Sequence, residues 1–259
     1  MCYDDNAIPP TPPGEAGAAQ GEDLVLIAGD GNRFYAYFAW PEHPSNAQIV
    51  IYPDVRGLHN FYKELAMRFA EVGITALAID YFGRTAGLSA RDSSFDYVPH
   101  VREMTLDGFF ADAKAALAYL RTGDGARRAT FVTGFCMGGS LTYISGTQDF
   151  GLAGVIGFYA GLSRQMAGAA KPVVDIGAEE KYPLLGLFGG ADQGIPVEQV
   201  HRFEEGLKQS GVDSKIVIYP GATHSFFDRR FEEFANESAD AWKQMLSFIE
   251  AHTPQASLT

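Results

Sequence analysis

The chain has 259 residues, of which 46% are hydrophobic, and its formal net charge is -12. This length and composition suit one α/β domain with a sizeable core, and the acidity argues against a nucleic-acid or anionic-membrane partner, since such binding needs clustered lysine and arginine. Cys2 and Cys136 are too few cysteines for a disulfide framework, and there is neither an apolar run of membrane-spanning length nor a signal peptide, so we expect a cytoplasmic protein.

Residues 1–21 form a distinct segment that is rich in proline and small residues. Such a segment is either disordered or laid extended over the body, and we expect an extended arm, followed by a single domain over residues 22–259. The sequence leaves open whether the protein forms a homodimer in which this arm docks on the second subunit. The arm leads into two predicted strands, Asp23 to Ala28 and Arg33 to Trp40, which a turn of Gly and Asp joins into an antiparallel sheet edge.

The segment from Gln48 to Tyr52 is a continuous apolar run, the kind of strand that a parallel sheet buries on both faces. A loop, Pro53 to Asn60, follows it and leads into a stretch of helical periodicity from Phe61 to Val72. Ile74 to Asp80 is the next predicted strand. Residues 81–102 are then polar, aromatic and arginine-bearing, and loops of this kind beyond the carboxyl end of a strand roof a binding pocket.

From residue 105 onward, predicted helices and strands alternate. An amphipathic helix is expected over Thr105 to Leu120. The later elements are strands at 129–135, 152–159, 183–190 and 215–219, and helices that start at 140 and span 197–210 and 232–251, while 161–182 is expected to hold no long helix. This alternation predicts an α/β fold, with a mostly parallel central sheet, helices on both faces, and the site at the carboxyl ends of the strands.

Residues 129–140 contain the most informative motif of the chain. A β-branched, apolar run ends in Gly134-Phe135-Cys136-Met137-Gly138, and a helix-capable run follows at once. This pattern predicts a nucleophile elbow with cysteine in place of serine, because the strained turn exposes its central residue and the glycines let neighbouring backbone pass close. The alternative is a buried cysteine at an ordinary glycine-rich turn.

A base and an acid follow this motif in the expected order. Asp192 lies on a glycine-flanked loop after the strand at 183–190, and His224 lies on the loop after the strand at 215–219. A cysteine nucleophile needs a base, and the base needs a group that orients it. The order nucleophile, acid, histidine is that of an α/β-hydrolase. Four other histidines, His43, His100, His201 and His252, show no metal-ligand spacing with carboxylates or cysteine, so no metal site is expected.

Four segments carry a resemblance to a known family: Tyr52 to Gly57, Gly134 to Gly139, Gly189 to Asp192, and Gly221 to Phe226. On these segments the chain resembles the dienelactone hydrolase family of α/β-hydrolases, over roughly residues 23–251. The resemblance implies a Cys136, His224 and Asp192 triad that hydrolyses lactones and other activated esters without a metal or a cofactor.

The resemblance also assigns an accessory acid. In this family, the loop after the third strand carries a glutamate that interacts with the cysteine, and the matching residue here is Asp54, one methylene shorter. The other interpretation of Asp54 is a loop residue that bonds nearby backbone amides. Two amides complete the expected site, because an α/β-hydrolase takes its oxyanion-hole donors from this loop and from the residue after the nucleophile, which are Val55 and Met137.

Substrate-binding candidates come from the same resemblance. Family members that take carboxylate-bearing lactones use arginines from the segment after the fourth strand and from just after the histidine. Here these regions supply Arg84 and Arg229, and Tyr81 is a candidate lining residue. Surface exposure of an arginine and simple packing of an aromatic ring are the competing interpretations.

The resulting hypothesis is a hydrolase that acts on a small-molecule lactone or activated ester through a thioacyl-enzyme intermediate. One alternative is a broad carboxylesterase or thioesterase on the same triad. Another is a non-enzymatic thiol sensor, in which Cys136 is oxidised rather than acylated.

Overall fold

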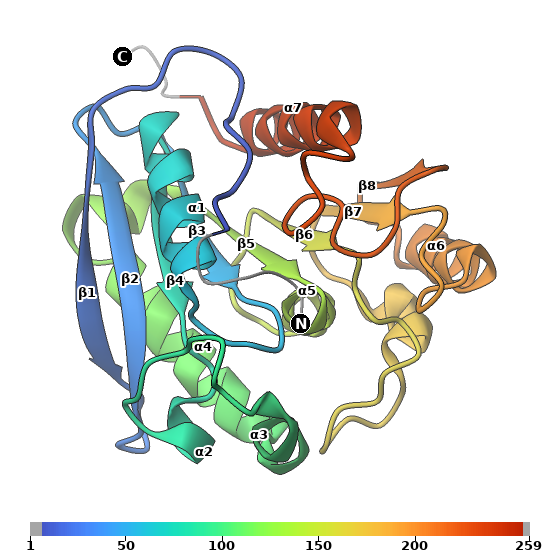
Figure 1. Ribbon diagram of the computed structural model, residues 1–259, viewed down its shortest axis with the longest axis horizontal. Coiled ribbons are helices and arrows are strands. Elements are labelled where there is room, and N and C mark those ends of the chain that lie inside the picture. Colours follow the sequence, from blue (N-terminus) through green and yellow to red (C-terminus); the bar gives the residue numbers. More distant parts are fainter. Residues whose placement is uncertain (1–6, 256–259) are drawn as a thin grey trace.

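An eight-stranded sheet runs through the structure, a computed structural model that describes residues 7–255 (Figure 1). Its strands are β1 (Ala19–Ile27), β2 (Arg33–Pro41), β3 (Ala47–Tyr52), β4 (Thr75–Ile79), β5 (Ala129–Phe135), β6 (Gly154–Phe158), β7 (Leu184–Gly189) and β8 (Ser214–Tyr219). Their spatial order is β1-β2-β4-β3-β5-β6-β7-β8. The β1–β2 and β2–β4 pairs are antiparallel and the other pairs are parallel, which confirms the predicted mostly parallel α/β sheet.

Helices cover both faces of this sheet (Figure 1). They are α1 (Asn60–Glu71), α2 (Gly83–Ala86), α3 (Tyr97–Glu103), α4 (Leu106–Leu120), α5 (Met137–Gly146), α6 (Val197–Ser210) and α7 (Ala235–Ala251), with short 3-10 turns η1 (Gly123–Arg127), η2 (Val173–Asp175) and η3 (Gly177–Glu179). Ring contacts between Phe69 and Trp242 join α1 to α7 on one face. On the other face, Tyr52 of β3 contacts α4 through Phe109 and α5 through Ser145.

The central strands are apolar because they have no solvent-exposed face. Every residue of β3, β4, β6 and β7 is buried, whereas the edge strand β1 is mostly exposed. Continuous apolar runs therefore mark the parallel strands in the sequence. The carboxyl ends of the parallel strands β3 to β8 therefore lie at the same edge of the sheet, and the segments that follow these strands contain the motifs described above.

The described part of the amino-terminal arm packs against α7 and α1. The Trp242 side chain donates a hydrogen bond from Nε1 to the Pro10 carbonyl (2.9 Å), and the Gly17 amide donates to the Glu71 carbonyl (2.8 Å). β1 starts at Ala19, four residues earlier than expected, because its first residues pair with the end of β2. Residues 1–6, which include Cys2, lie outside the described residues.

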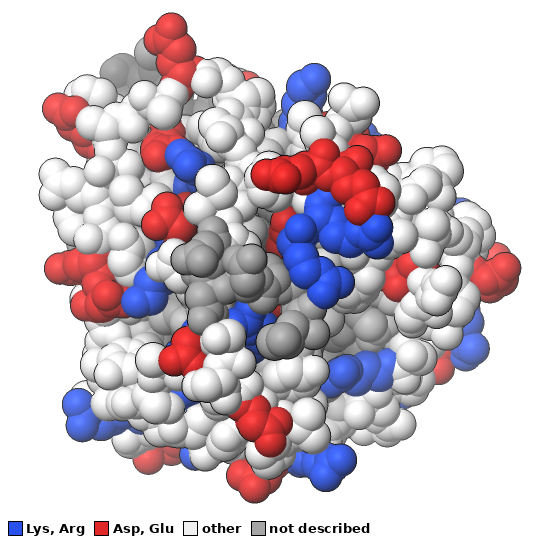
Figure 2. All heavy atoms as spheres, in the orientation of Figure 1, with Lys and Arg blue, Asp and Glu red and all other residues white. Residues whose placement is uncertain are grey.

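Charges of both signs are interspersed over the face of the molecule in Figure 2. Across residues 7–255, none of the helices combines the length and the apolarity that crossing a bilayer requires.

One carboxyl group is buried without compensation. Glu180 is 4% exposed, and neither of its carboxyl oxygens has a hydrogen-bond partner within residues 7–255. It follows η3 and packs on the end of α5, where a Cβ on Gly146 would lie 1.9 Å from Oε2. Burial raises the pKa of Glu180 well above its ordinary value, because the charged form is poorly solvated there.

Glu180 should make the protein less stable as the pH rises. Above the pKa of an unfolded glutamate, about 4.3, the folded protein keeps a proton that the unfolded chain releases, so the free energy of unfolding falls with pH. We predict that Glu180→Gln matches the wild type near pH 4 and is more stable at pH 8, as measured by urea unfolding at both values. The exposed neighbour Glu179 supplies the control Glu179→Gln, which should show no such pH dependence. Equal stability of Glu180→Gln and wild type at pH 8 would contradict the prediction.

Candidate active site

Cys136 sits at a sharp turn between β5 and α5. Its backbone has φ 54° and ψ -113°, in the left-handed half of conformational space that a side chain rarely adopts. The Cys136 amide donates to the Phe158 carbonyl at the end of β6 (3.0 Å), which fastens the turn to the neighbouring strand. The thiol is not part of a disulfide, and the residue is half-buried. The turn therefore has the backbone geometry expected of the elbow.

Two glycines make this turn sterically feasible. A Cβ on Gly134 would lie 2.1 Å from the Gly138 carbonyl oxygen, and a Cβ on Gly138 would lie 2.2 Å from the carbonyl oxygens of both Tyr52 and Pro53. The backbone of the β3 loop therefore passes directly over the first turn of α5, and only glycine leaves room for it.

Asp192 and His224 meet beyond the ends of β7 and β8. The His224 Nδ1 atom lies 2.7 Å from Asp192 Oδ2, and the other carboxylate oxygen of Asp192 accepts the Gly194 amide (2.8 Å). The Asp192 side chain is 2% exposed and that of His224 is 34% exposed. Thus the acid is fixed by the fold, whereas the imidazole is open to a substrate or to water.

The electrostatic surroundings of His224 favour the imidazolium. Burial by itself lowers the pKa of His224, but hydrogen bonds to Asp192 and Cys136 and the charges of these groups raise it to about 10. The structure thus brings the three side chains Cys136, His224 and Asp192 into one hydrogen-bonded set. At neutral pH this set suits a protonated imidazole at His224.

The loop after β3 and the start of α5 border this set. Met137 is the first residue of α5, so its amide belongs to the first turn, whose N–H groups have no partner inside the helix. Val55 is half-buried in the loop whose backbone passes over that turn. Both amides therefore belong to segments that meet beside Cys136, as an oxyanion hole requires.

Asp54 and Tyr81 are used to build this loop. Asp54 is fully buried and its Oδ1 accepts the Arg56 amide (2.9 Å), a contact to nearby backbone of the kind that the second interpretation expects. The Tyr81 hydroxyl donates to the carbonyl oxygens of Pro53 and Asp54. Burial, with the charges of Asp54 and Cys136, raises the pKa of Tyr81 well above its ordinary value, so the hydroxyl keeps its proton and its donor role.

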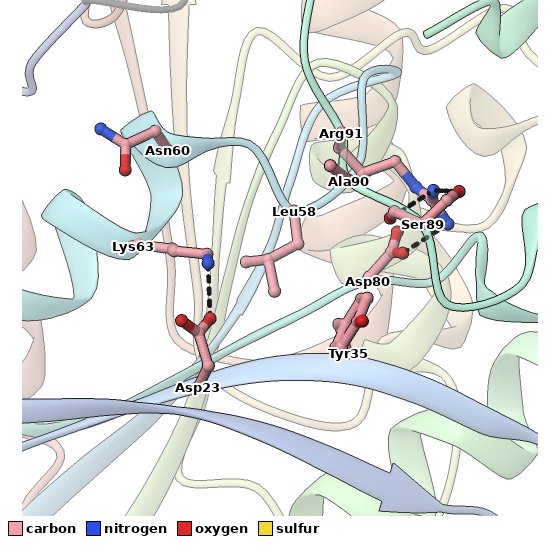
Figure 3. A pocket seen from close by; sticks show the side chains of 9 residues that line it. All are labelled: Asp23, Tyr35, Leu58, Asn60, Lys63, Asp80, Ser89, Ala90 and Arg91. Carbon is pink, nitrogen blue, oxygen red and sulfur yellow. Dashed lines mark hydrogen bonds and ion pairs between the residues drawn. The ribbon is translucent and has the colours of Figure 1, made fainter.

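An ion pair supports the loop from the other side. Asp80 and Arg91 are both buried, and Nη2 of Arg91 lies 2.7 Å from Oδ2 of Asp80 (Figure 3). The loop passes close to this pair, because a Cβ on Gly57 would lie 2.7 Å from Asp80 Oδ1. Leu58, from the same loop, lines a pocket of about 460 Å³ with this pair. Arg91 is therefore committed to the loop architecture rather than to a ligand.

Of the two predicted arginines, one lies beside the site and one is engaged elsewhere. Arg84 is bound by the carboxylates of Asp30 and Asp112 and by the Gly108 carbonyl. Arg229 is exposed and lines a pocket of about 540 Å³ together with His224 and Asp192. A group of basic side chains lies over the loop that follows β8, beside a group of acidic ones (Figure 2).

Three residues that the sequence did not single out, Arg164, Asp228 and Tyr159, also lie near the site. Arg164 places Nη1 3.4 Å from the sulfur of Met137. Asp228, 1% exposed, accepts a hydrogen bond from the Tyr159 hydroxyl (2.8 Å), and the Tyr159 ring centroid lies 5.0 Å from that of His224. The position of Asp228 four residues after the histidine was the only signal for it in the sequence. Arg164 lies in a connection without regular periodicity, which offered none.

No group of three or more histidine, cysteine, aspartate or glutamate side chains within residues 7–255 is arranged to hold a metal ion.

Comparison with known proteins agrees with this architecture. The model of the dienelactone hydrolase family matches residues 34–253. A Methylorubrum extorquens protein named "Putative carboxymethylenebutenolidase" is 32% identical over 215 residues, covering 81% of this chain and 74% of its own length. An Escherichia coli (strain K12) protein of the same name is 25% identical over 254 residues, 92% of each chain.

Solved structures share the fold at lower identity. A Klebsiella pneumoniae protein solved as a "Putative Dienelactone Hydrolase" has a TM-score of 0.78 at 24% identity, covering 90% of this chain and 99% of its own. A Pyrococcus furiosus esterase has a TM-score of 0.69 at 14% identity, covering 94% and 98%. These likenesses place the chain among α/β-hydrolase folds.

The glycine at the start of α5 supplies a test of the turn. We predict that Gly138→Ala lowers the free energy of unfolding by about 2 kcal/mol or more, because the added methyl group would overlap two backbone carbonyls that do not move freely. Thermal or urea unfolding measures the change. Gly221→Ala is the matched control, since a Cβ there meets nothing within 4 Å. Equal stability of the two variants would show that the close approach at Gly138 is not a constraint.

Proposed function

We propose that this chain, which belongs to the dienelactone hydrolase family, hydrolyses lactones or activated carboxylic esters with Cys136 as nucleophile, His224 as base and Asp192 as the acid that orients the base. One observation carries the proposal: the imidazole of His224 is hydrogen-bonded on one side to Asp192, at 2.7 Å, and on the other to Cys136. A nucleophile in contact with a base, which is in turn held by an acid, is the arrangement that enzymes use to form a covalent acyl intermediate.

In the first half of the reaction, the Cys136 thiolate forms a bond to the carbonyl carbon of the ester. The electron pair of the carbonyl moves to its oxygen, which the amides of Val55 and Met137 would stabilise. As the intermediate collapses, the bond to the leaving oxygen breaks and the His224 imidazolium gives that oxygen its proton. A thioester on Cys136 remains, and for a lactone the released alcohol or enol stays attached to the acyl group.

In the second half, His224 is neutral and takes a proton from water as the water oxygen attacks the thioester. The carbon–sulfur bond then breaks, which restores the thiolate and releases the acid. Asp192 keeps the imidazole in the tautomer that this step needs. Because a thiolate leaves more readily than an alkoxide, the first intermediate reverts unless the substrate has a stabilised leaving group, so lactones and activated esters suit the site better than amides.

A broad carboxylesterase or thioesterase on the same residues is the second candidate. The placement of Arg84 favours it, because this guanidinium is held by Asp30 and Asp112. A thiol sensor would use the same reactive Cys136 without ester turnover. All three functions need a reduced thiol, and a cytoplasmic location is part of the proposal for that reason.

Removal of the thiol tests the nucleophile. We predict that Cys136→Ala lowers kcat/KM for 4-nitrophenyl acetate by about a thousandfold or more, as loss of a covalent nucleophile typically does. The assay follows nitrophenolate release under reducing conditions. Cys2→Ala is the control and should retain the activity. Retention of most activity in Cys136→Ala would remove this residue from the mechanism, and wild-type protein without turnover would favour the sensor.

A second test concerns the charge of the substrate. Arg164 forms no ion pair within residues 7–255, lies beside Met137, and could meet a substrate carboxylate. We predict that Arg164→Ala reduces kcat/KM roughly 10-fold to 100-fold for a 4-nitrophenyl ester with a free carboxylate, while the neutral acetate ester is affected little, because one charge-assisted hydrogen bond contributes about 1.5–3 kcal/mol.

Arg84→Ala and Arg229→Ala complete this comparison. Arg84→Ala should leave the preference between the two esters unchanged, since its partners lie outside the site, whereas Arg229→Ala reports whether the pocket beside His224 contributes. A wild-type enzyme with no preference for the charged ester would instead support the broad esterase.

A further inference from the structure

A second carboxylate lies beneath the histidine loop. Asp228 is 1% exposed and belongs to the turn that follows His224. One of its oxygens accepts the Tyr159 hydroxyl at 2.8 Å, and the other accepts the backbone amide of Arg229. A carboxylate in so dry a place needs such partners, because its desolvation is otherwise unfavourable.

Tyr159 links this carboxylate to the reaction site. It directly follows β6, its backbone has φ 34°, and its amide donates to the Leu187 carbonyl of β7 (2.8 Å). The preceding residue, Phe158, accepts the Cys136 amide. The aromatic ring of Tyr159 packs against the imidazole of His224, with centroids 5.0 Å apart and planes inclined by 58°. One strained residue thus contacts the histidine and the buried carboxylate, and it directly follows the residue that binds the elbow amide.

The charges around Asp228 couple it to His224. Burial raises the pKa of Asp228 to about 6, although the Arg229 amide, the Tyr159 hydroxyl and the positive charge of His224 each favour the ionised form. The attraction is mutual, so the Asp228 carboxylate also favours the imidazolium.

Other titratable and charged groups face the same imidazole. They are Cys136 from the start of α5, Asp192 from the loop after β7, Tyr159 from the end of β6, and Arg229 and Arg230, which line the pocket beside the imidazole.

We propose that Asp228 is a positioning residue for the reaction, which acts through Tyr159 and through its charge to hold His224 as the imidazolium partner of the Cys136 thiolate. This inference rests on the function proposed above, in which the pair of Cys136 and His224 performs the chemistry. It adds to that function a second buried carboxylate, which touches no substrate.

A purely structural role is the competing explanation, since Asp228 also fastens the turn after β8. The two roles differ in what the substitution Asp228→Asn changes. The amide keeps the shape of the side chain: its oxygen can accept the Arg229 amide while its NH2 group donates to the Tyr159 hydroxyl oxygen, but the charge is removed. A purely structural role depends on the hydrogen bonds of this side chain, whereas the proposed role also depends on the negative charge of Asp228.

The experiment follows the titration of His224 by NMR, through the Cε1–H signal of its imidazole, in the full-length protein. His224→Gln identifies the signal. In Asp228→Asn the signal should titrate at a pH lower by about half a unit to one unit, and the alkaline limb of kcat/KM for 4-nitrophenyl acetate should move in the same direction. The NMR readout needs no turnover, so a failure of the proposed function and a failure of this inference are distinguishable.

The chain offers a matched control. Tyr219 donates to Asp240 Oδ2 at 2.9 Å, the same kind of hydrogen bond between a strand-end tyrosine and an aspartate, and Asp240→Asn should leave the His224 titration unchanged. An Asp228→Asn variant in which His224 titrates at the same pH as in the wild type, or an equal shift in Asp240→Asn, would overturn the proposal.

Tyr159→Phe keeps the proposal testable if Asp228→Asn does not fold. Without the phenolic donor, the Asp228 carboxylate should be protonated more readily, so kcat/KM should fall more strongly below about pH 7 than above it. A fall of equal size at every pH would assign Tyr159 and Asp228 to structure alone.

Discussion

The direction of the Cys136 sulfur depends on one backbone constraint, the left-handed turn between β5 and α5. This conformation is costly for a residue with a side chain, and it persists because the surroundings leave no alternative: the Cys136 amide is bound to the end of β6, and Gly138 lies under the carbonyls of the β3 loop. The turn fixes the position of Cys136 between β5 and α5, and the other groups of the site are arranged around it.

The sheet then decides which groups meet the thiol. Because β5, β7 and β8 are parallel, the segments that follow them leave the same edge, and this brings Cys136, Asp192 and His224 together from positions 32 to 88 residues apart in the chain. Buried polar contacts hold these segments in place. The Tyr81 hydroxyl and the Asp80–Arg91 pair secure the β3 loop, and the proposed role of Asp228 extends the same principle to the histidine loop.

Most of the fold could be predicted from local patterns. The strand at 183–190 and the helix at 197–210 appear almost residue for residue as β7 and α6, because burial on both faces and burial on one face leave different apolar periodicities. The predicted start of an element was wrong where strand pairing lengthens a strand or where turns take the place of the first residues of a helix. β1 begins early because it pairs along the end of β2, and α7 begins at Ala235, after a run of turns.

The amino-acid sequence by itself determined the fold class, the elbow motif, and the order of cysteine, aspartate and histidine, because these depend on local periodicity and on spacing along the chain. The tertiary structure alone decided which charged groups face the thiol. Arg84 was a candidate by position, but Asp30 and Asp112, distant in sequence, hold its guanidinium, whereas Arg164 and Asp228 reach the site from segments without a motif. A side chain's direction and its ion-pair partners arise from packing between elements, and the linear sequence does not encode that packing locally.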